Sequence, residues 1–347
     1  MKRFLSIALL LALAVSCEIP FEFTPEAGPC LYVQAVAEDG AVVVTPFVAL
    51  PVNGSTSADG PIRGEVSVNG TLVQTISTAS GQAVTIPCDL QDGDAVSVRL
   101  SADGLASAEG ETALLPALKV TDVAMETFPV DTLQVTKVTL TLDHAPSAEE
   151  YYGIQIHAHI RNEYEDGKQE EVDEFQTPGY ILTMMELLNF DLENYMQVNW
   201  DGRLLGCPEP RLLTFVTARQ FKGNRYQFLL NSYDALILNG IRDGMPGGDT
   251  GMVGGGIVSG NVGSGGKEKE KAPKPVSSHT EYTVEFYRLS DSFYQYGKTL
   301  YQSNFDFLSN MGFTPANFTW GNVRGGMGFV GAVSSWSFGP FSPDKEN

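Results

Sequence analysis

The chain has 347 residues, of which 43% are hydrophobic and 18% charged, a composition typical of folded globular proteins rather than of disordered or coiled-coil chains. Acidic residues outnumber basic ones by 42 to 22, and the resulting net charge of −20 argues against a nucleic-acid-binding surface, which needs clustered cations. Composition alone identifies neither a substrate nor a reaction.

Residues 1–16 have the features of a secretory signal peptide. Met1-Lys2-Arg3 is cationic, and Phe4–Val15 is an apolar run that is too short to remain in a bilayer as a spanning helix. The run ends in Ala14-Val15-Ser16-Cys17, where a lipoprotein signal peptidase would leave Cys17 as an acylated N-terminus. The alternative is cleavage at another position, with Cys17 incidental.

Residues 17–29 are predicted to be a lipidated tether, because they hold three prolines and show no periodicity. Loss of Lys2 and Arg3 with the leader changes the net charge from −20 to −22, so the body is expected to stand off an anionic lipid surface. No later segment reaches the roughly 18 consecutive apolar residues of a transmembrane helix, and the lipid is the expected anchor.

Residues 30–116 are predicted to form a β-sandwich with an immunoglobulin-like arrangement. Asn69-Gly70 predicts a type I′ hairpin turn, because both residues tolerate positive φ. Apolar and polar residues alternate over Ala95–Leu100, which predicts a strand with one buried face. The predicted strands are Leu31–Ala37, Ala41–Leu50, Glu65–Val68, Thr71–Ile76, Ala83–Pro87 and Ala95–Leu100.

Three cysteines remain after Cys17. Export to an oxidising compartment favours a disulfide, and Cys30 and Cys88 are the favoured pair because both lie in the first β-rich region. The alternative is that these two and Cys207 are free, buried thiols, since three is an odd number. No Cys-x-x-Cys spacing is present, so a zinc site is not predicted.

Residues 117–347 are predicted to form a second, larger β-rich domain with one or two short helices. The clearest helix is Ser290–Gln302, where aromatic residues fall on one stripe, and the second candidate is Thr183–Asn189. Phe221–Tyr226 is interpreted as a hairpin turn. The predicted strands are Lys137–Leu142, Tyr151–Ile160, Leu212–Ala218, Tyr226–Ser232, Glu281–Leu289 and Gly326–Phe338.

A segment of different composition, residues 244–275, interrupts this domain. Eleven of the 23 residues from Gly244 to Gly266 are glycine, and a lysine-rich run follows. Such a segment cannot bury a core, so a flexible loop is predicted, with a ligand lid as the alternative. Gly266-Lys267 is followed by Glu268, which excludes a P-loop.

Candidate metal and acidic sites lie around one predicted strand. His157 and His159 share a strand face and could bind a metal, but no third ligand can be placed, so the interpretation is that both decorate a wet face. Glu163–Glu174 holds seven acidic residues in twelve and is interpreted as a solvated hairpin tip, because it lacks the order of a calcium loop. Neither a metal nor a cofactor is predicted.

No catalytic residue is predicted either. The chain has no Gly-x-Ser-x-Gly motif, and none of its four histidines sits in a recognisable catalytic frame. Aromatic residues crowd the last third of the chain. They are interpreted mainly as core, with exposed members as candidates for binding sugars or protein partners.

Two stretches of the C-terminal region resemble a known family. Ser290–Gln302 is an aromatic helix, and Pro315–Gly331 ends in a pattern of glycines around Met327 and Phe329. In this order they resemble the Bacteroidetes lipoproteins of the domain-of-unknown-function 4249 family. The resemblance implies an outer-membrane lipoprotein, often encoded beside a TonB-dependent receptor. It implies no established activity and supplies no functional residues.

The sequence therefore predicts a lipid-anchored envelope protein that acts without catalysis as an accessory or binding module. The expected partner is a TonB-dependent outer-membrane transporter, and the expected ligand is a carbohydrate or a peptide. One alternative is a surface hydrolase of glycans or peptides, suggested by the envelope address and the many carboxylates. Another is a structural component of a surface layer or fimbria, which predicts an exposed edge strand.

Overall fold

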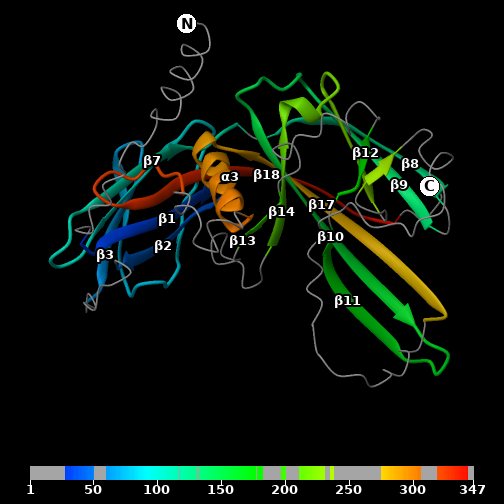
Figure 1. Cartoon of the computed structure of the whole chain (residues 1–347), viewed down its shortest axis with the longest axis horizontal. Coiled ribbons are helices and arrows are strands. Elements are labelled where there is room, and N and C mark those ends of the chain that lie inside the picture. The colour runs from blue at the N-terminus through cyan, green and yellow to red at the C-terminus, as the bar shows by residue number, and fades with distance from the viewer. Residues whose placement is uncertain are drawn as a thin grey trace, which may run out of the picture.

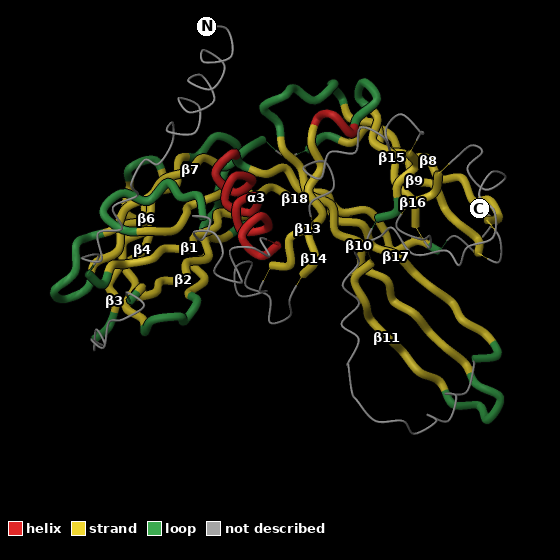
Figure 2. Tube along the Cα trace, viewed as in Figure 1, coloured by secondary structure: helices red, strands yellow, loops and turns green. Residues whose placement is uncertain are grey.

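The computed structural model describes residues 28–50, 60–116, 118–130, 133–176, 178–182, 197–200, 211–230, 235–237, 275–305 and 319–342. The protein is mainly β, as predicted, with one α-helix among these residues (Figures 1 and 2). In the part of the chain so described, no helix is both long and apolar enough to cross a membrane.

Nine strands form the largest sheet, in the order β13-β14-β10-β17-β18-β1-β2-β5, with β11 paired to β10 outside this path. Only β1, β2 and β5 come from the predicted N-terminal domain. The strands are β1 (Cys30–Glu38), β2 (Ala41–Ala49), β5 (Val84–Pro87), β10 (Tyr151–Glu163), β11 (Gln169–Gln176), β13 (Gln197–Trp200), β14 (Arg211–Thr217), β17 (Ser277–Leu289) and β18 (Met327–Phe341).

A four-stranded sheet in the order β4-β3-β6-β7 packs on the N-terminal strands of the large sheet. The apolar residues of this double layer alternate with exposed ones, as the sequence predicts for Ala95–Leu100. Asn69 and Gly70 both have positive φ and join β3 to β4, which confirms the predicted hairpin. The strands are β3 (Ile62–Val68), β4 (Thr71–Thr78), β6 (Ala95–Ser101) and β7 (Ala108–Ala113).

The immunoglobulin-like arrangement and the division after residue 116 stay predictions. The packing between the two sheets also includes Val330 and Ala332 of the last strand, so residues from both ends of the chain share this core.

A three-stranded sheet in the order β15-β9-β8 covers the other part of the large sheet, and a pair of three-residue strands lies beside it (Figure 1). The predicted hairpin at Phe221–Tyr226 is wrong. Lys222 and Arg225 close a tight turn, but the flanking strands β14 and β15 pair with different sheets. The elements are β8 (Val120–Val130), β9 (Leu133–Leu142), the 3-10 helix η3 (Ala218–Gln220), β15 (Arg225–Leu230), β12 (Tyr180–Leu182) and β16 (Ala235–Ile237).

The helix predicted at Ser290–Gln302 is α3 (Asp291–Phe305). The hydroxyl of Ser290 accepts a hydrogen bond from the amide of Phe293 (3.2 Å), which satisfies one of the free donors in the first turn. The same hydroxyl accepts the amide of Ala332 (2.9 Å). Ser290 therefore fixes the start of the helix against β18, and the buried rings of Phe293, Tyr294 and Tyr296 pack on the sheet.

Strand β18 changes partner along its length. Its first part, Met327–Ala332, runs parallel to β1, and its second part, Val333–Phe341, runs antiparallel to β17. Gly328 has φ +101° and approaches β1 so closely that a Cβ atom would lie 1.9 Å from the carbonyl oxygen of Val33. The glycine pattern that resembles the family thus permits close backbone contact.

Candidate functional site

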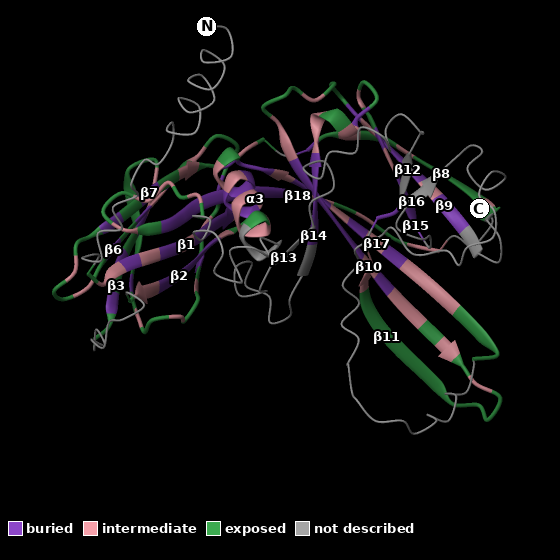
Figure 3. Ribbon diagram, viewed as in Figure 1, coloured by how far each residue is buried: buried purple, intermediate pink, exposed green. Residues whose placement is uncertain are grey.

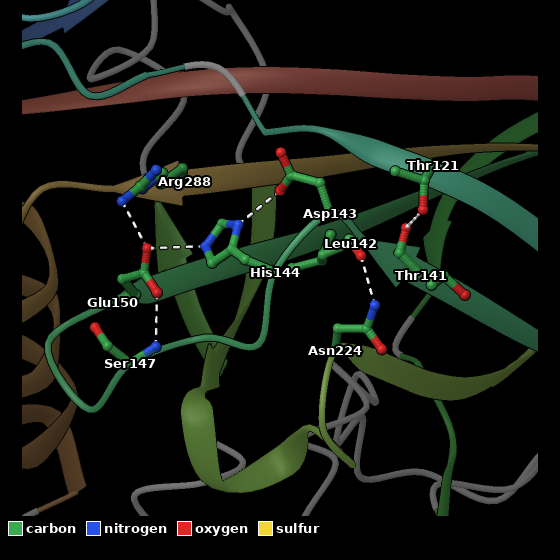
Figure 4. Close-up of polar contacts among 9 residues, drawn as sticks. All are labelled: Thr121, Thr141, Leu142, Asp143, His144, Ser147, Glu150, Asn224 and Arg288. Atoms are coloured by element: carbon green, nitrogen blue, oxygen red, sulfur yellow. Dashed lines mark hydrogen bonds and ion pairs between the residues drawn. The ribbon is translucent and has the colours of Figure 1, made fainter.

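A polar cluster lies in the connection between β9 and β10, where the chain passes from the three-stranded sheet to the large one. The Nδ1 atom of His144 is 2.6 Å from Oδ1 of Asp143, and its Nε2 atom is 3.2 Å from Oε1 of Glu150 (Figure 4). Arg288 of β17 donates to the same Oε1 atom at 2.7 Å, and the amide of Ser147 donates to Oε2 at 2.6 Å. The cluster therefore joins this connection to the centre of the large sheet.

The charges of the cluster support one another. The hydrogen bond with Asp143 and the nearby Glu150 raise the pKa of His144 above its usual value, and the pKa of Asp143 is lowered chiefly by the same hydrogen bond. Burial alone would raise the pKa of Glu150, but the amide of Ser147, His144 and Arg288 outweigh burial and lower it. The two carboxylates thus favour the protonated form of the imidazole more than water would.

A buried polar row continues from this cluster across the sheet. Tyr152 lies opposite Arg288, and Arg288 lies opposite Ser334. Tyr152 is fully buried, burial raises the pKa of its phenol to about 12, and its hydroxyl has no hydrogen-bond partner among the described residues. The Nε atom of Arg288 also has none. These groups lie at the border of the aromatic core, where Tyr152 contacts the ring of Phe286.

The arrangement around His144 suits anchoring better than proton transfer to a substrate. Both ring nitrogens already face carboxylates, so neither is available to act as a general base. Glu150 is shared by His144, Arg288 and a backbone amide and is only 15% exposed. Asp143 and Glu150 are therefore positioned to hold the connection in place.

The histidine face predicted on β10 lies on an arm built from β10, β11 and β17 (Figure 2). His157 and His159 are partly exposed, whereas Ile156 and Ala158 on the opposite face are buried, as predicted. Asp173 of β11 lies opposite His159, with 2.7 Å between its Oδ1 atom and Nδ1 of the ring.

The same Asp173 oxygen is 3.8 Å from Nε2 of His157. On the other side, Arg161 donates to Nε2 of His159 at 3.2 Å. This places a fixed positive charge beside the ring. Over the described residues, no group of three or more His, Cys, Asp or Glu side chains is placed to hold a metal ion.

The acidic segment Glu163–Glu174 is only partly the loop that its composition suggests. The turn is short and contains Gly167 with φ +77°, and residues 169–176 form strand β11. Backbone pairing with β10 outweighs the poor strand propensity of the carboxylates, which point into solvent on both faces.

The predicted disulfide between Cys30 and Cys88 is wrong. Cys30 lies opposite Ala49 at one end of the β1–β2 hairpin, whereas the amide of Cys88 donates to Gly40 at the other end (3.0 Å). Nine strand residues span about 27 Å, and a disulfide needs Cα atoms within about 7 Å. Both thiols are free and half-buried, and burial raises the pKa of Cys88.

Among the described residues, most of the C-terminal aromatics belong to the core or pack against it, as interpreted. Phe286, Phe293 and Phe329 are fully buried, while Trp336 and Phe338 at the end of β18 are half-exposed with nearly parallel rings.

Several predicted features lie outside the described residues. They are Cys17, Cys207, residues 244–274 of the predicted loop at 244–275, and the helix at Thr183–Asn189.

Sequence reasoning missed the cluster at His144. Asp143, His144 and Glu150 are close in the sequence, but their spacing resembles an ordinary charged loop. Arg288, which gives the cluster its partly buried positive charge, lies 138 residues beyond Glu150. No local signal connects the two.

The fold is that of a mainly-β protein. It has a charged, solvent-facing arm of β10, β11 and β17, and a polar cluster in the connection between β9 and β10. The chain matches the profile of the family described as "Domain of unknown function (DUF4249)" over residues 18–337 and belongs to that family. No curated protein matches it. A solved SusE-like protein is 9% identical, with 57% of this chain and 94% of that chain covered and a TM-score of 0.19, a similarity too low to support an inference.

Proposed function

We propose that this protein is a non-catalytic accessory or binding protein of the cell envelope, held on the outer membrane by lipid at Cys17. The proposed partner is a TonB-dependent transporter, and the proposed ligand is an extracellular carbohydrate or peptide. The leader sequence, the acidic body and the family membership support this assignment.

The observation that carries the proposal is the arm formed by β10, β11 and β17 (Figure 3). Six of the eight residues of β11 are exposed and the other two are half-buried, so this strand adds almost nothing to the core. Four of its exposed residues are acidic: Glu170, Glu171, Asp173 and Glu174. A ribbon that buries so little of itself and presents ionisable groups on both faces is suited to contact another molecule.

Affinity purification from envelopes in mild detergent tests the partner. Glu170→Lys combined with Glu174→Lys reverses two exposed charges of the arm, and we expect about a tenfold loss of the co-purifying protein. The matched control, Glu65→Lys with Asp92→Lys, reverses two exposed charges on the N-terminal double layer and should retain it. A chain that is always recovered alone would contradict the partner assignment.

The anchor is tested separately. Cys17→Ala should abolish incorporation of labelled fatty acid and move the protein from the membrane fraction to the soluble fraction. Incorporation that persists in this variant would contradict lipidation at Cys17.

A hydrolase remains the alternative that the many carboxylates suggest. The two carboxylates of the polar cluster, Asp143 and Glu150, both contact His144. Because both are engaged in this way, the cluster gives no support to hydrolysis over binding.

A further inference from the structure

Among the residues that the structure describes, strand β4 is an open edge of the four-stranded sheet. Seven of its eight residues are exposed or half-buried, and Leu72 and Val73 are 53% and 41% exposed. The strand contains neither a charged residue nor a proline. Long, uncharged edges with exposed apolar side chains readily pair with another strand, and proteins usually protect them.

Several other described edges carry such protection. The edge of β7 is covered by reciprocal backbone hydrogen bonds between Glu109 and Arg324. Strand β5 has four residues and ends in Pro87, and β8 contains Pro129 and two acids. Strand β11 carries four acids, and the second part of β18 is capped by Asp39 at Ser335 and contains Pro340.

The one irregularity in β4 leaves most of the edge usable. Val73 has no partner in β3, so a bulge lies at this position. From Gln74 to Thr78 the pairing with β3 is regular. Thr75 and Ser77 face outward in this segment, whereas Ile76 is buried in the core of the double layer. A strand added here would extend the sheet and its inner apolar face.

Charge indicates which strand could bind. The β3–β4 hairpin contains one cation, Arg63, and one anion, Glu65, so it is neutral within a chain of net charge −20. At physiological salt, charges farther away than about 8 Å are largely screened, so the local balance decides whether two copies can approach. Pairing two copies through β11 would instead place carboxylates opposite carboxylates.

We propose that two copies of this chain associate by antiparallel pairing of their β4 edges over Gln74–Thr78, which joins two four-stranded sheets into one. A two-fold axis near Ile76 places Thr75 of one copy opposite Ser77 of the other, a favourable uncharged pair. The contact is small, so we expect a weak dimer that forms where the chain is concentrated, as on a membrane surface. The proposal depends on the geometry of β4 and not on the identity of a ligand or transporter.

Sedimentation of the full mature chain over a wide concentration range tests this contact. Thr75→Lys with Ser77→Lys should weaken dimerisation by about tenfold or more, because like charges then meet across the axis. Val172→Lys, an exposed position on the edge strand β11, is the matched control and should leave dimerisation unchanged. Circular dichroism confirms that each variant is folded.

A mixing experiment identifies the occupant. A chain with Thr75→Glu and Ser77→Glu should also be monomeric alone, but it should associate with the lysine variant, because opposite charges then face each other. A wild-type chain that is monomeric throughout, a mixture that does not associate, or a different protein bound at β4 would each overturn the proposal.

Discussion

The two parts of the molecule are stabilised by different kinds of core. The buried cluster of the N-terminal double layer consists only of valine, leucine, isoleucine and alanine. Around β10, β17 and α3 the buried clusters are rich in phenylalanine and tyrosine. The polar cluster at His144 borders the second kind, where Tyr152, with its buried hydroxyl, lies opposite Arg288 in the strand register. Aromatic packing therefore introduces polar groups into the interior, and aliphatic packing does not.

The largest effect is expected from truncation in the aromatic core. Phe286→Ala should lower the free energy of unfolding by about 4 kcal/mol, because it removes a fully buried ring that contacts Tyr152 and Tyr226. Leu100→Ala in the aliphatic core should lower it by about 3 kcal/mol. Urea denaturation measures both, and an equal or smaller loss for Phe286→Ala would contradict the distinction between the cores.

Gly328→Ala tests the contact where the two parts meet. The added methyl group would collide with the carbonyl of Val33, and backbone cannot move aside as a flexible side chain can. We expect a loss of about 3 kcal/mol. Gly93→Ala is the matched control, with φ +88° and open space around the site, and should cost only about 1 kcal/mol. Similar losses for both variants would refute the close approach.

Arg288→Met addresses the partly buried charge at the border of the aromatic part. It leaves Glu150 with fewer partners in a mostly buried position, and we expect a loss of about 2 kcal/mol. Adding Glu150→Gln should recover part of this loss, because it removes the carboxylate charge that Arg288 no longer balances. Thermal unfolding of the single and double variants measures the coupling. Strict additivity would show that the two side chains do not act together.

His144→Gln should have a smaller, pH-dependent effect. The raised pKa of His144 means that its contribution is fully present below about pH 6.5 and is lost as the pH rises through the folded-state value. The lowered pKa values of Asp143 and Glu150 give contributions that are present above about pH 4.5 and lost as the pH falls through their folded-state values.

The difference between wild type and His144→Gln should therefore be greatest at about pH 5–6 and stay below about 1 kcal/mol, because the ring is 44% exposed. Unfolding midpoints measured across pH check this, and a difference that grows above pH 8 would contradict the assignment.

The smallest effect is expected from reduction. Dithiothreitol should leave the unfolding midpoint unchanged, because Cys30 and Cys88 lie at opposite ends of a hairpin and are free. Peptide mapping after alkylation without reduction should find both thiols modified. A peptide linked through these two residues would show that the hairpin register is different.

Local sequence patterns predicted two kinds of element. These are strands in which apolar and polar residues alternate, and turns that require residues able to adopt positive φ. Asn69-Gly70 and Ala95–Leu100 are examples, because each signal lies within a few neighbouring residues. The helix at α3 was also readable, since Ser290 caps a stripe of aromatic residues.

Features that depend on distant partners were not readable. Strand β11 is held by backbone pairing despite its carboxylates. Cys88 is free because its amide bonds to Gly40, at the end of the β1–β2 hairpin that lies far from Cys30. The cluster at His144 needs Arg288 from another strand, and its two carboxylates look like ordinary loop residues until the sheet brings them together.

The partner change along β18 has a consequence for the order of folding. Tyr32 of β1 pairs with Met327 of β18, a sequence separation of about 300 residues. Strand β1 therefore gains this neighbour only when nearly the whole polypeptide is available. Until then, Leu31 and Val33 lack the packing that Val330 and Ala332 of β18 contribute to their core. Truncation before Met327 should therefore leave the N-terminal layers prone to aggregation.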